Sequence, residues 1–205
     1  MSWILYSSPR SPFVRKVMIA AHEVGFSGRI QRQDVMTNPM RPSLEVLEFN
    51  PLGMIPTLVA DGEMIFDSLV ILEFLNEQAA SPLFPAAAAA RRDCLTRHAV
   101  ANGMMDKAVR MLDETFRAEQ NNDTAEHIAG FSDAQLRSVE WMGKRLQLDR
   151  FDAGDIAFVS ALAYLDFRFP KIEWRNHSPA AAAWFASASE RPSMQKTAMA
   201  VPPKP

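Results

Sequence analysis

The segment NPLGMIPTL, residues 50–58, limits the possible folds of this chain more than any other stretch. It places an X-Pro bond, the only kind of peptide bond that becomes cis at low cost, directly before strand-forming residues. We expect the Ile55–Pro56 bond to be cis and the main chain of Ile55 to face outward, ready to pair with another extended chain. Asp67 and Ser68 then open a predicted helix, whose free N–H groups suit a carboxylate. These residues predict a slot for a small, extended, anionic ligand.

Strand and helix signals alternate over the first 80 residues, which indicates a small mixed sheet with helices on it. Asp61-Gly62 is a strong signal for a tight hairpin. Ser11-Pro12 is a favoured helix start, and Gly25 is a natural stop. The predicted elements are strands at 3–6 and 29–35, a helix from Pro12 to Gly25, a hairpin of 57–60 and 63–66, and a helix from Ser68 to about Gln78.

The strand signals end after residue 80, where the composition changes. The segment SPLFPAAAAA, residues 81–90, is typical of a linker that runs into a helix. The expected helices are one through 95–116, one at 132–148 capped by Ser132, one through 156–167 after Asp152, and short ones from Ser178-Pro179 and from Pro192. We therefore expect a first domain at residues 1–79 and an all-helical second domain at residues 86–205.

Charge and hydropathy exclude several classes of protein. The 205 residues carry a formal net charge of −2, which gives no electrostatic signature of nucleic-acid binding. No apolar run approaches the roughly 18 residues that a membrane helix needs, and no signal peptide is recognisable. Cys94, the only cysteine, predicts a reducing, cytoplasmic location and a packing role. The chain lacks the paired Cys or His ligands of a zinc site, so we expect no metal.

Five motifs, in order along the chain, resemble the glutathione S-transferase superfamily. They are LYSSPRSPFVRKV (5–17), NPLGMIPTL (50–58), FDS (66–68), DAGDIA (152–157) and RPSM (191–194). The stretches at 102–109 and 154–170 are most similar to bacterial YibF-like members, and the serine at position 11 is similar to zeta-like members. The resemblance implies a thioredoxin-like N-terminal domain, an all-helical C-terminal domain and a homodimer.

Ser11 is the candidate catalytic residue. The resemblance places it where the family holds a hydroxyl or thiol against the sulfur of glutathione. A hydroxyl that donates a hydrogen bond to sulfur, at the positive end of a helix, favours the thiolate. Ser11 also suits the helix N-cap, and Ser8 and Ser7 are competing hydroxyls. Because serine cannot form a mixed disulfide, we expect transfer of glutathione to an electrophile and not glutaredoxin-like turnover.

The resemblance implies the residues that bind glutathione as co-substrate. The main chain of Ile55, before Pro56, pairs with the cysteine residue of glutathione. Ser68 holds the γ-glutamyl carboxylate, Asp67 faces the ammonium group, and Phe13 borders the cleft. Many relatives carry Lys or Gln at the position of Met54, so the glycine end needs another residue here. The candidates are Arg10, Arg32 and Arg41.

An acceptor pocket for an apolar electrophile is expected on the helix through 98–112, with His98, Asn102 and Met105 as its candidates. Their helical spacing also suits a packed core. The leading hypothesis is a cytosolic glutathione transferase. The alternative is a non-catalytic binding or regulatory protein on the same scaffold, because folds of this kind serve many functions.

Overall fold

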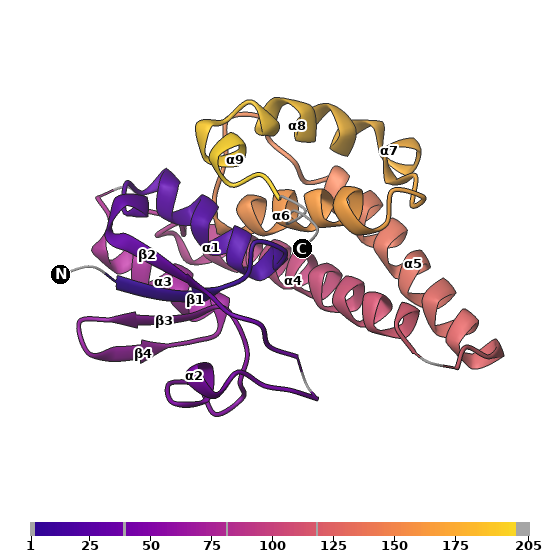
Figure 1. Ribbon diagram of the computed structural model, residues 1–205. Helices are drawn as coiled ribbons and strands as arrows, with labels where there is room; N and C mark the ends of the chain where they lie inside the picture. The colour runs from indigo at the N-terminus through magenta and orange to yellow at the C-terminus, as the bar shows by residue number, and fades with distance from the viewer. Residues whose placement is uncertain (1–2, 39, 81, 118, 200–205) are drawn as a thin grey trace. The chain divides into compact units, whose positions relative to one another are not determined.

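The computed structural model describes residues 3–38, 40–80, 82–117 and 119–199, which form two compact units (Figure 1). Unit 1 comprises the chain up to Phe84 and a return segment from Pro192; unit 2 comprises Pro85–Arg191. The predicted fold class is confirmed: unit 1 has a four-stranded sheet with helices, and the described part of unit 2 is helical without strands. Ser81, in the predicted linker, lies outside the described residues.

The sheet of unit 1 has the strand order β2-β1-β3-β4. The strands are β1 (Trp3–Ser7), β2 (Ile30–Asp34), β3 (Thr57–Ala60) and β4 (Glu63–Ile65). β1 pairs parallel with β2 and antiparallel with β3. Asp61 and Gly62 join β3 to β4 with φ of 52° and 90°, the two positive values that a tight hairpin turn requires, so the predicted hairpin is confirmed.

Three helices and two short turns complete unit 1: α1 (Pro12–Glu23), the 3-10 turn η1 (Ser27–Arg29), the single turn α2 (Leu44–Leu47), α3 (Ser68–Gln78) and α9 (Pro192–Lys196). α1 packs against both α3 and α9. The division expected from sequence put residues 192–205 in the helical domain, whereas α9 groups with unit 1. The reason is long-range pairing, because Ser193 donates a hydrogen bond to Glu23 and the carbonyl of Met194 accepts one from Arg15.

Unit 2 is built around a long helix and a buried one. Its helices are α4 (Ala88–Thr115), α5 (Asn122–Gly143), α6 (Ala153–Arg168), α7 (Trp174–His177) and α8 (Pro179–Ser189). Every residue of α6 from Ala153 to Leu165 is buried. Asp152 and Asp155 form a capping box at its start. Gly154 allows α6 to approach α4, since a Cβ there would lie 2.8 Å from the carbonyl oxygen of Cys94.

The prediction for α5 was wrong at both ends. The helix begins at Asn122, ten residues before the expected cap, because Asn121 and Thr124 form a capping box in a polar stretch. Ser132 lies inside the helix and its hydroxyl donates to the carbonyl of Ile128 at 2.9 Å. The helix ends at Gly143 and not at residue 148. Its last residue lies close to Ser178, since a Cβ at Gly143 would be 2.3 Å from Oγ of Ser178.

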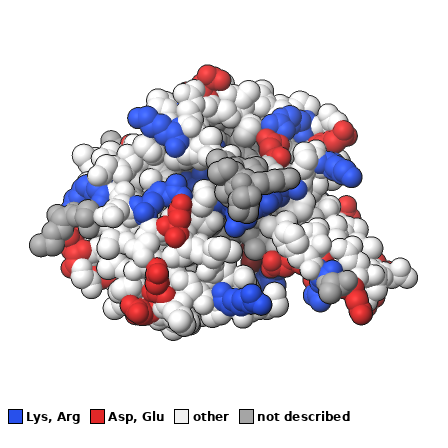
Figure 2. All heavy atoms as spheres, in the orientation of Figure 1, with Lys and Arg blue, Asp and Glu red and all other residues white. Residues whose placement is uncertain are grey.

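Three properties of the described residues bear on the expectations from composition: the surface charge, the apolar character of the helices and the burial of Cys94. Acidic and basic side chains are interspersed over the face shown in Figure 2, in keeping with the small net charge. Within the described residues, no helix combines the length and the apolar character needed to cross a membrane. Cys94 is buried, and burial raises the pKa of its thiol to about 12, which agrees with the expected packing role.

Candidate functional site

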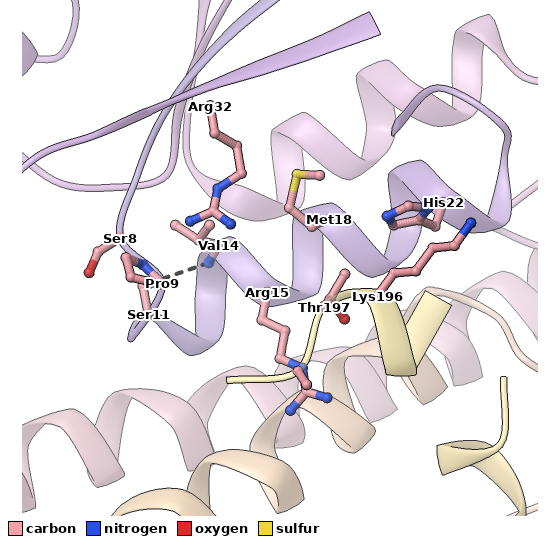
Figure 3. A pocket seen from close by; sticks show the side chains of 11 residues that line it. Ser8, Pro9, Ser11, Val14, Arg15, Met18, His22, Arg32, Lys196 and Thr197 are labelled. Carbon is pink, nitrogen blue, oxygen red and sulfur yellow. Dashed lines mark hydrogen bonds between the residues drawn. The ribbon is translucent and has the colours of Figure 1, made fainter. Parts of the chain in front are cut away.

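Ser11 is the N-cap of α1, and its cap role leaves its own hydroxyl hydrogen available. Its Oγ accepts a hydrogen bond from the main-chain N–H of Val14 at 3.3 Å (Figure 3). The main-chain N–H of Ser11 donates to the carbonyl of Ser8 at 3.1 Å, which fixes the turn before the helix. Pro12 at the first helical position also favours the helix start here. The cap and a hydrogen bond from Ser11 to an anion are therefore compatible.

The two competing hydroxyls differ in their surroundings. Ser7 is fully buried; its hydroxyl donates to Asp34 at 2.5 Å and accepts from Arg32 at 3.3 Å. Its hydrogen is thus committed inside the protein. Ser8 is half-buried and lines the same cavity as Ser11. The choice between Ser11 and Ser8 stays a prediction that mutagenesis can decide.

The segment before β3 is held rigidly by two polar side chains. The buried amide of Asn50 donates to the carbonyl of Met54 at 3.1 Å and to the hydroxyl of Thr57 at 3.0 Å. Thr57 donates in turn to the carbonyl of Met54 at 2.8 Å. The Ile55–Pro56 bond is cis, as predicted. The main-chain N–H and C=O of Ile55 form no hydrogen bond with the described residues, so both are available to a ligand.

The start of α3 offers hydrogen-bond donors to an anion. The carboxylate of Asp67 caps the helix by accepting from the N–H of Leu69 at 3.0 Å. Ser68 is 2% exposed, and neither its hydroxyl nor its N–H bonds to any described residue. Such free groups at a helix N-terminus favour a carboxylate. These properties suit the role expected of Ser68.

Lys16 brings a basic group to the same part of unit 1. Its side chain is fully buried on α1, and its Nζ lies 5.8 Å from the ring centroid of half-buried Phe13. Burial lowers the pKa of Lys16 to about 7, while the carboxylate of Asp67 acts in the opposite direction. The charge of Asp67, at the start of α3, thus acts on the ammonium group of Lys16 on α1.

A cavity of about 80 Å³ lies along one side of α1 and begins at Ser11 (Figure 3). All of it belongs to unit 1. Its lining comprises the turn before α1, four residues of α1, Arg32 from β2, and the chain at the end of α9. The residues are Ser8, Pro9, Ser11, Val14, Arg15, Met18, His22, Arg32, Lys196, Thr197 and Ala198.

The residues expected to bind an acceptor lie on α4 in unit 2. Met105 is fully buried, His98 is 3% exposed and Asn102 is half-buried. His98 and Asn102 each have an interaction partner. Only Asn102 of the three thus presents much accessible surface, and their role in binding stays a prediction.

The arginines expected to hold the glycine end of glutathione differ in their freedom. Arg10 and Arg41 are exposed, whereas Arg32 is paired with Asp34 at 2.9 Å. Met54 is 59% exposed and provides no donor. Among the described residues, no group of three or more His, Cys, Asp or Glu side chains is placed to hold a metal ion.

Comparison with known proteins identifies the family to which both units are similar. The model of the glutathione S-transferase N-terminal domain matches residues 10–78, and the model of the C-terminal domain matches residues 125–187. The uncharacterised GST-like protein YibF of Escherichia coli K12 is 31% identical over 175 residues, which cover 80% of this chain and 82% of YibF. The chain belongs to the glutathione S-transferase family. The resemblance stated from the five motifs is thereby confirmed.

Solved structures of other glutathione S-transferase family members extend the comparison to three dimensions. A member from Pseudomonas fluorescens Pf-5, with bound glutathione, is 37% identical and superposes with a TM-score of 0.93 over 98% of this chain and 100% of that chain. A structure of a member from the same strain, with bound S-(propanoic acid)-glutathione, is 36% identical and has a TM-score of 0.88 over 97% of this chain and 100% of that one.

The sequence reasoning missed most of the cavity in this glutathione S-transferase family member. It named Ser11, Ser8 and Arg32, but not Arg15, His22 or Lys196. The first two could have been found, because Ser11, Arg15, Met18 and His22 are spaced by four, three and four residues and so share one helical face. Lys196 could not, since no local pattern brings the end of the chain back to α1.

Proposed function

We propose that this family member is a glutathione transferase in which Ser11 stabilises the thiolate of glutathione for attack on an organic electrophile. The observation that carries the proposal is the state of Ser11. Its oxygen accepts from Val14, which leaves its hydrogen to donate to sulfur at the positive end of α1. A hydrogen bond to the anion lowers the thiol pKa from about 8.5 and raises the thiolate fraction at neutral pH.

In the proposed complex, glutathione lies along the end of β3 and the start of α3. The main chain of Ile55 pairs with its cysteine residue, Ser68 binds the γ-glutamyl carboxylate, Asp67 faces the ammonium group, and Phe13 borders the cleft. Support comes from the unpaired groups of Ile55 and Ser68, and from the relative of known structure that holds glutathione.

The proposed reaction forms one carbon–sulfur bond. The thiol proton passes to solvent, the thiolate attacks the electrophilic carbon, and a leaving group departs with its bonding electron pair. The related structure with S-(propanoic acid)-glutathione contains glutathione with a substituent on sulfur, which is the type of product that this reaction gives. Of the three α4 residues expected to bind an acceptor, Asn102 is the one with accessible surface for it.

A second candidate function is a non-catalytic binding or regulatory role, in the cytoplasm and on the same scaffold. The observation in its favour is the exposed Met54, which offers no donor to the glycine end. Calorimetry with glutathione and turnover of 1-chloro-2,4-dinitrobenzene separate the two functions. A transferase gives both signals, whereas absence of glutathione binding, or binding without turnover, favours the second function.

The Ser11→Ala variant tests the catalytic assignment. We expect turnover to fall roughly 100-fold, as when one donor to a catalytic anion is removed, with glutathione binding retained. The lost cap costs about 0.5–2 kcal/mol of folding stability, so circular dichroism should still show a folded protein. Ser8→Ala is the matched control and should keep its activity. If Ser8→Ala lost turnover and Ser11→Ala did not, the catalytic hydroxyl would be that of Ser8.

We also propose a homodimer, as the family resemblance implies. Unit 1 exposes many large apolar side chains for its size: Met36, Met40, Leu44, Leu47, Leu52, Met54, Met64 and Val70. Exposed apolar surface of this kind is common where a protein binds a partner.

A further inference from the structure

We propose that the cavity beside Ser11 binds a carboxylate carried by the electrophile, and that the guanidinium of Arg15 is its partner. The inference rests on the proposed function, because it names the class of acceptor used at the same site. It assigns a specificity role to a helical face that the glutathione slot does not use.

The lining of the cavity has one sign of charge. Its charged lining residues are Arg15, Arg32 and Lys196, and no Asp or Glu lines it. His22 also lines it, but burial lowers the pKa of this histidine and so favours its neutral form. Figure 3 shows Arg15, Met18 and His22 following one another along α1, with Arg32 on the opposite side and Lys196 and Thr197 near the end of α9. A small cavity with basic groups on several sides favours an anion.

Arg32 does not supply the free charge. Its guanidinium lies 2.9 Å from the carboxylate of Asp34 and also donates to the hydroxyl of Ser7 at 3.3 Å. Asp34 therefore neutralises most of its charge. Arg32 forms a wall of the cavity, whereas Arg15 on α1 has no carboxylate partner in the described part of the chain.

Arg15 is a half-buried guanidinium with poor compensation. Its Nε is buried and has no hydrogen-bond partner. Its Nη2 reaches only the carbonyl of Met194 at 3.4 Å and the sulfur of the same residue at 4.0 Å. Among the described residues no carboxylate pairs with it. Burial lowers the pKa of Arg15 to about 10, so the group remains charged at neutral pH.

An incoming carboxylate would supply the negative charge that Arg15 lacks as a partner. A buried charge without an opposite charge is costly, and a carboxylate forms strong, charge-assisted hydrogen bonds with a guanidinium. The four residues from Ser11 to Arg15 correspond to about 6 Å along the helix axis. This spacing fits a small acceptor whose carboxylate lies a few bonds from the carbon that sulfur attacks at Ser11.

Two electrophiles that differ in one group test the proposal: 4-chloro-3-nitrobenzoate and 4-chloro-3-nitrobenzamide. In both, sulfur would bond to the carbon that bears chlorine, and chloride would leave with the bonding pair. We expect wild-type protein to bind the benzoate more tightly than the amide in calorimetry without glutathione. In Arg15→Gln, binding of the benzoate should weaken about tenfold or more, with the amide unchanged. Arg15→Lys should restore part of the preference.

Arg29→Gln is the matched control, because it removes one positive charge from an exposed residue of unit 1 that does not line the cavity. It should bind both compounds as the wild type does. Thermal unfolding of Arg15→Gln reports whether loss of the contact with Met194 disturbs the fold.

Four results would overturn the proposal: equal binding of both compounds by the wild type, equal losses for both in Arg15→Gln, the same loss in Arg29→Gln, or conversion of the amide alone. Turnover with glutathione is measured separately. If the benzoate binds through Arg15 but neither compound is converted, the anion site stands and the proposed transferase function fails. If only the amide is converted, the function stands and the anion site fails.

Discussion

Lys16 is a fully buried lysine on α1 whose pKa depends on its surroundings. Burial lowers that pKa to about 7, against the opposing effect of Asp67. Below this pH the side chain is charged in the folded and unfolded chain alike. Between about 7 and about 10.4, only the unfolded chain holds the proton. The unfolded state then binds more protons, so the free energy of unfolding rises with pH across this window.

We therefore predict a pH-dependent stability difference between the wild type and Lys16→Met. The free energy of unfolding of the wild type should rise relative to the variant by up to about 1.4 kcal/mol per pH unit above neutral pH. Urea unfolding of both proteins from about pH 6 to about pH 9 measures the difference. Parallel curves would show that Lys16 titrates normally in the folded protein.

Single residues also show how far sequence reasoning reaches. The cis bond at Ile55–Pro56 and the cap at Ser11 follow from local chemistry, and the structure contains both. The choice among neighbouring hydroxyls does not, because the burial of Ser7 depends on Asp34 and Arg32 in another strand. Long-range pairing of this kind leaves no local pattern in the sequence.

At the scale of elements, the sequence predicts the start of a helix more accurately where the N-cap residue comes directly before apolar residues than where it comes before polar ones. Asp152 leads directly into the buried α6, and its helix was expected. Asn121 leads into a polar first turn, so the start of α5 was placed too late. The buried Arg97 links two helices near the first of these caps. It binds both carboxylate oxygens of Asp152, at 3.0 and 2.5 Å, and Asp155 at 2.9 Å.

Arg97→Met should strongly destabilise unit 2. The substitution leaves the buried carboxylate of Asp152 without its main partner, although Arg150 still donates to Asp155. Breaking a buried ion pair in this way typically costs about 3–5 kcal/mol. Arg92→Met, on the exposed face of the same helix, should change stability by less than about 0.5 kcal/mol. Chemical unfolding of both variants provides the comparison. Equal stabilities would mean that the ion pairs of Arg97 contribute no net stability.

For the whole molecule, the change in composition near residue 80 indicated two parts, and the alternation of strand and helix identified the first. The return of α9 to unit 1 depends on contacts with α1 that are distant in sequence. Local sequence patterns likewise do not predict how two copies of the chain would associate. Exposed apolar residues are visible only once burial is known.

The proposed homodimer predicts a mass twice the 22.9 kDa of the chain in sedimentation experiments. Introducing charge at two exposed apolar positions of unit 1, Leu52→Glu with Met64→Glu, should shift the mass toward that of the monomer. Leu148→Glu, at an 81% exposed position of unit 2, is the control and should leave the mass unchanged. A monomeric wild type at micromolar concentration would contradict the proposal.

The return of α9 to α1 has a consequence for biosynthesis. Residues 85–191 are inserted between the two parts of unit 1, so the unit that leaves the ribosome first is completed last. At a synthesis rate of about 5–20 residues per second, the nascent sheet waits roughly 5–20 seconds for α9. During that interval Arg15 lacks the carbonyl of Met194, and the cavity lacks the wall made by Lys196, Thr197 and Ala198. The anion site is thus assembled only after all of unit 2 has been synthesised.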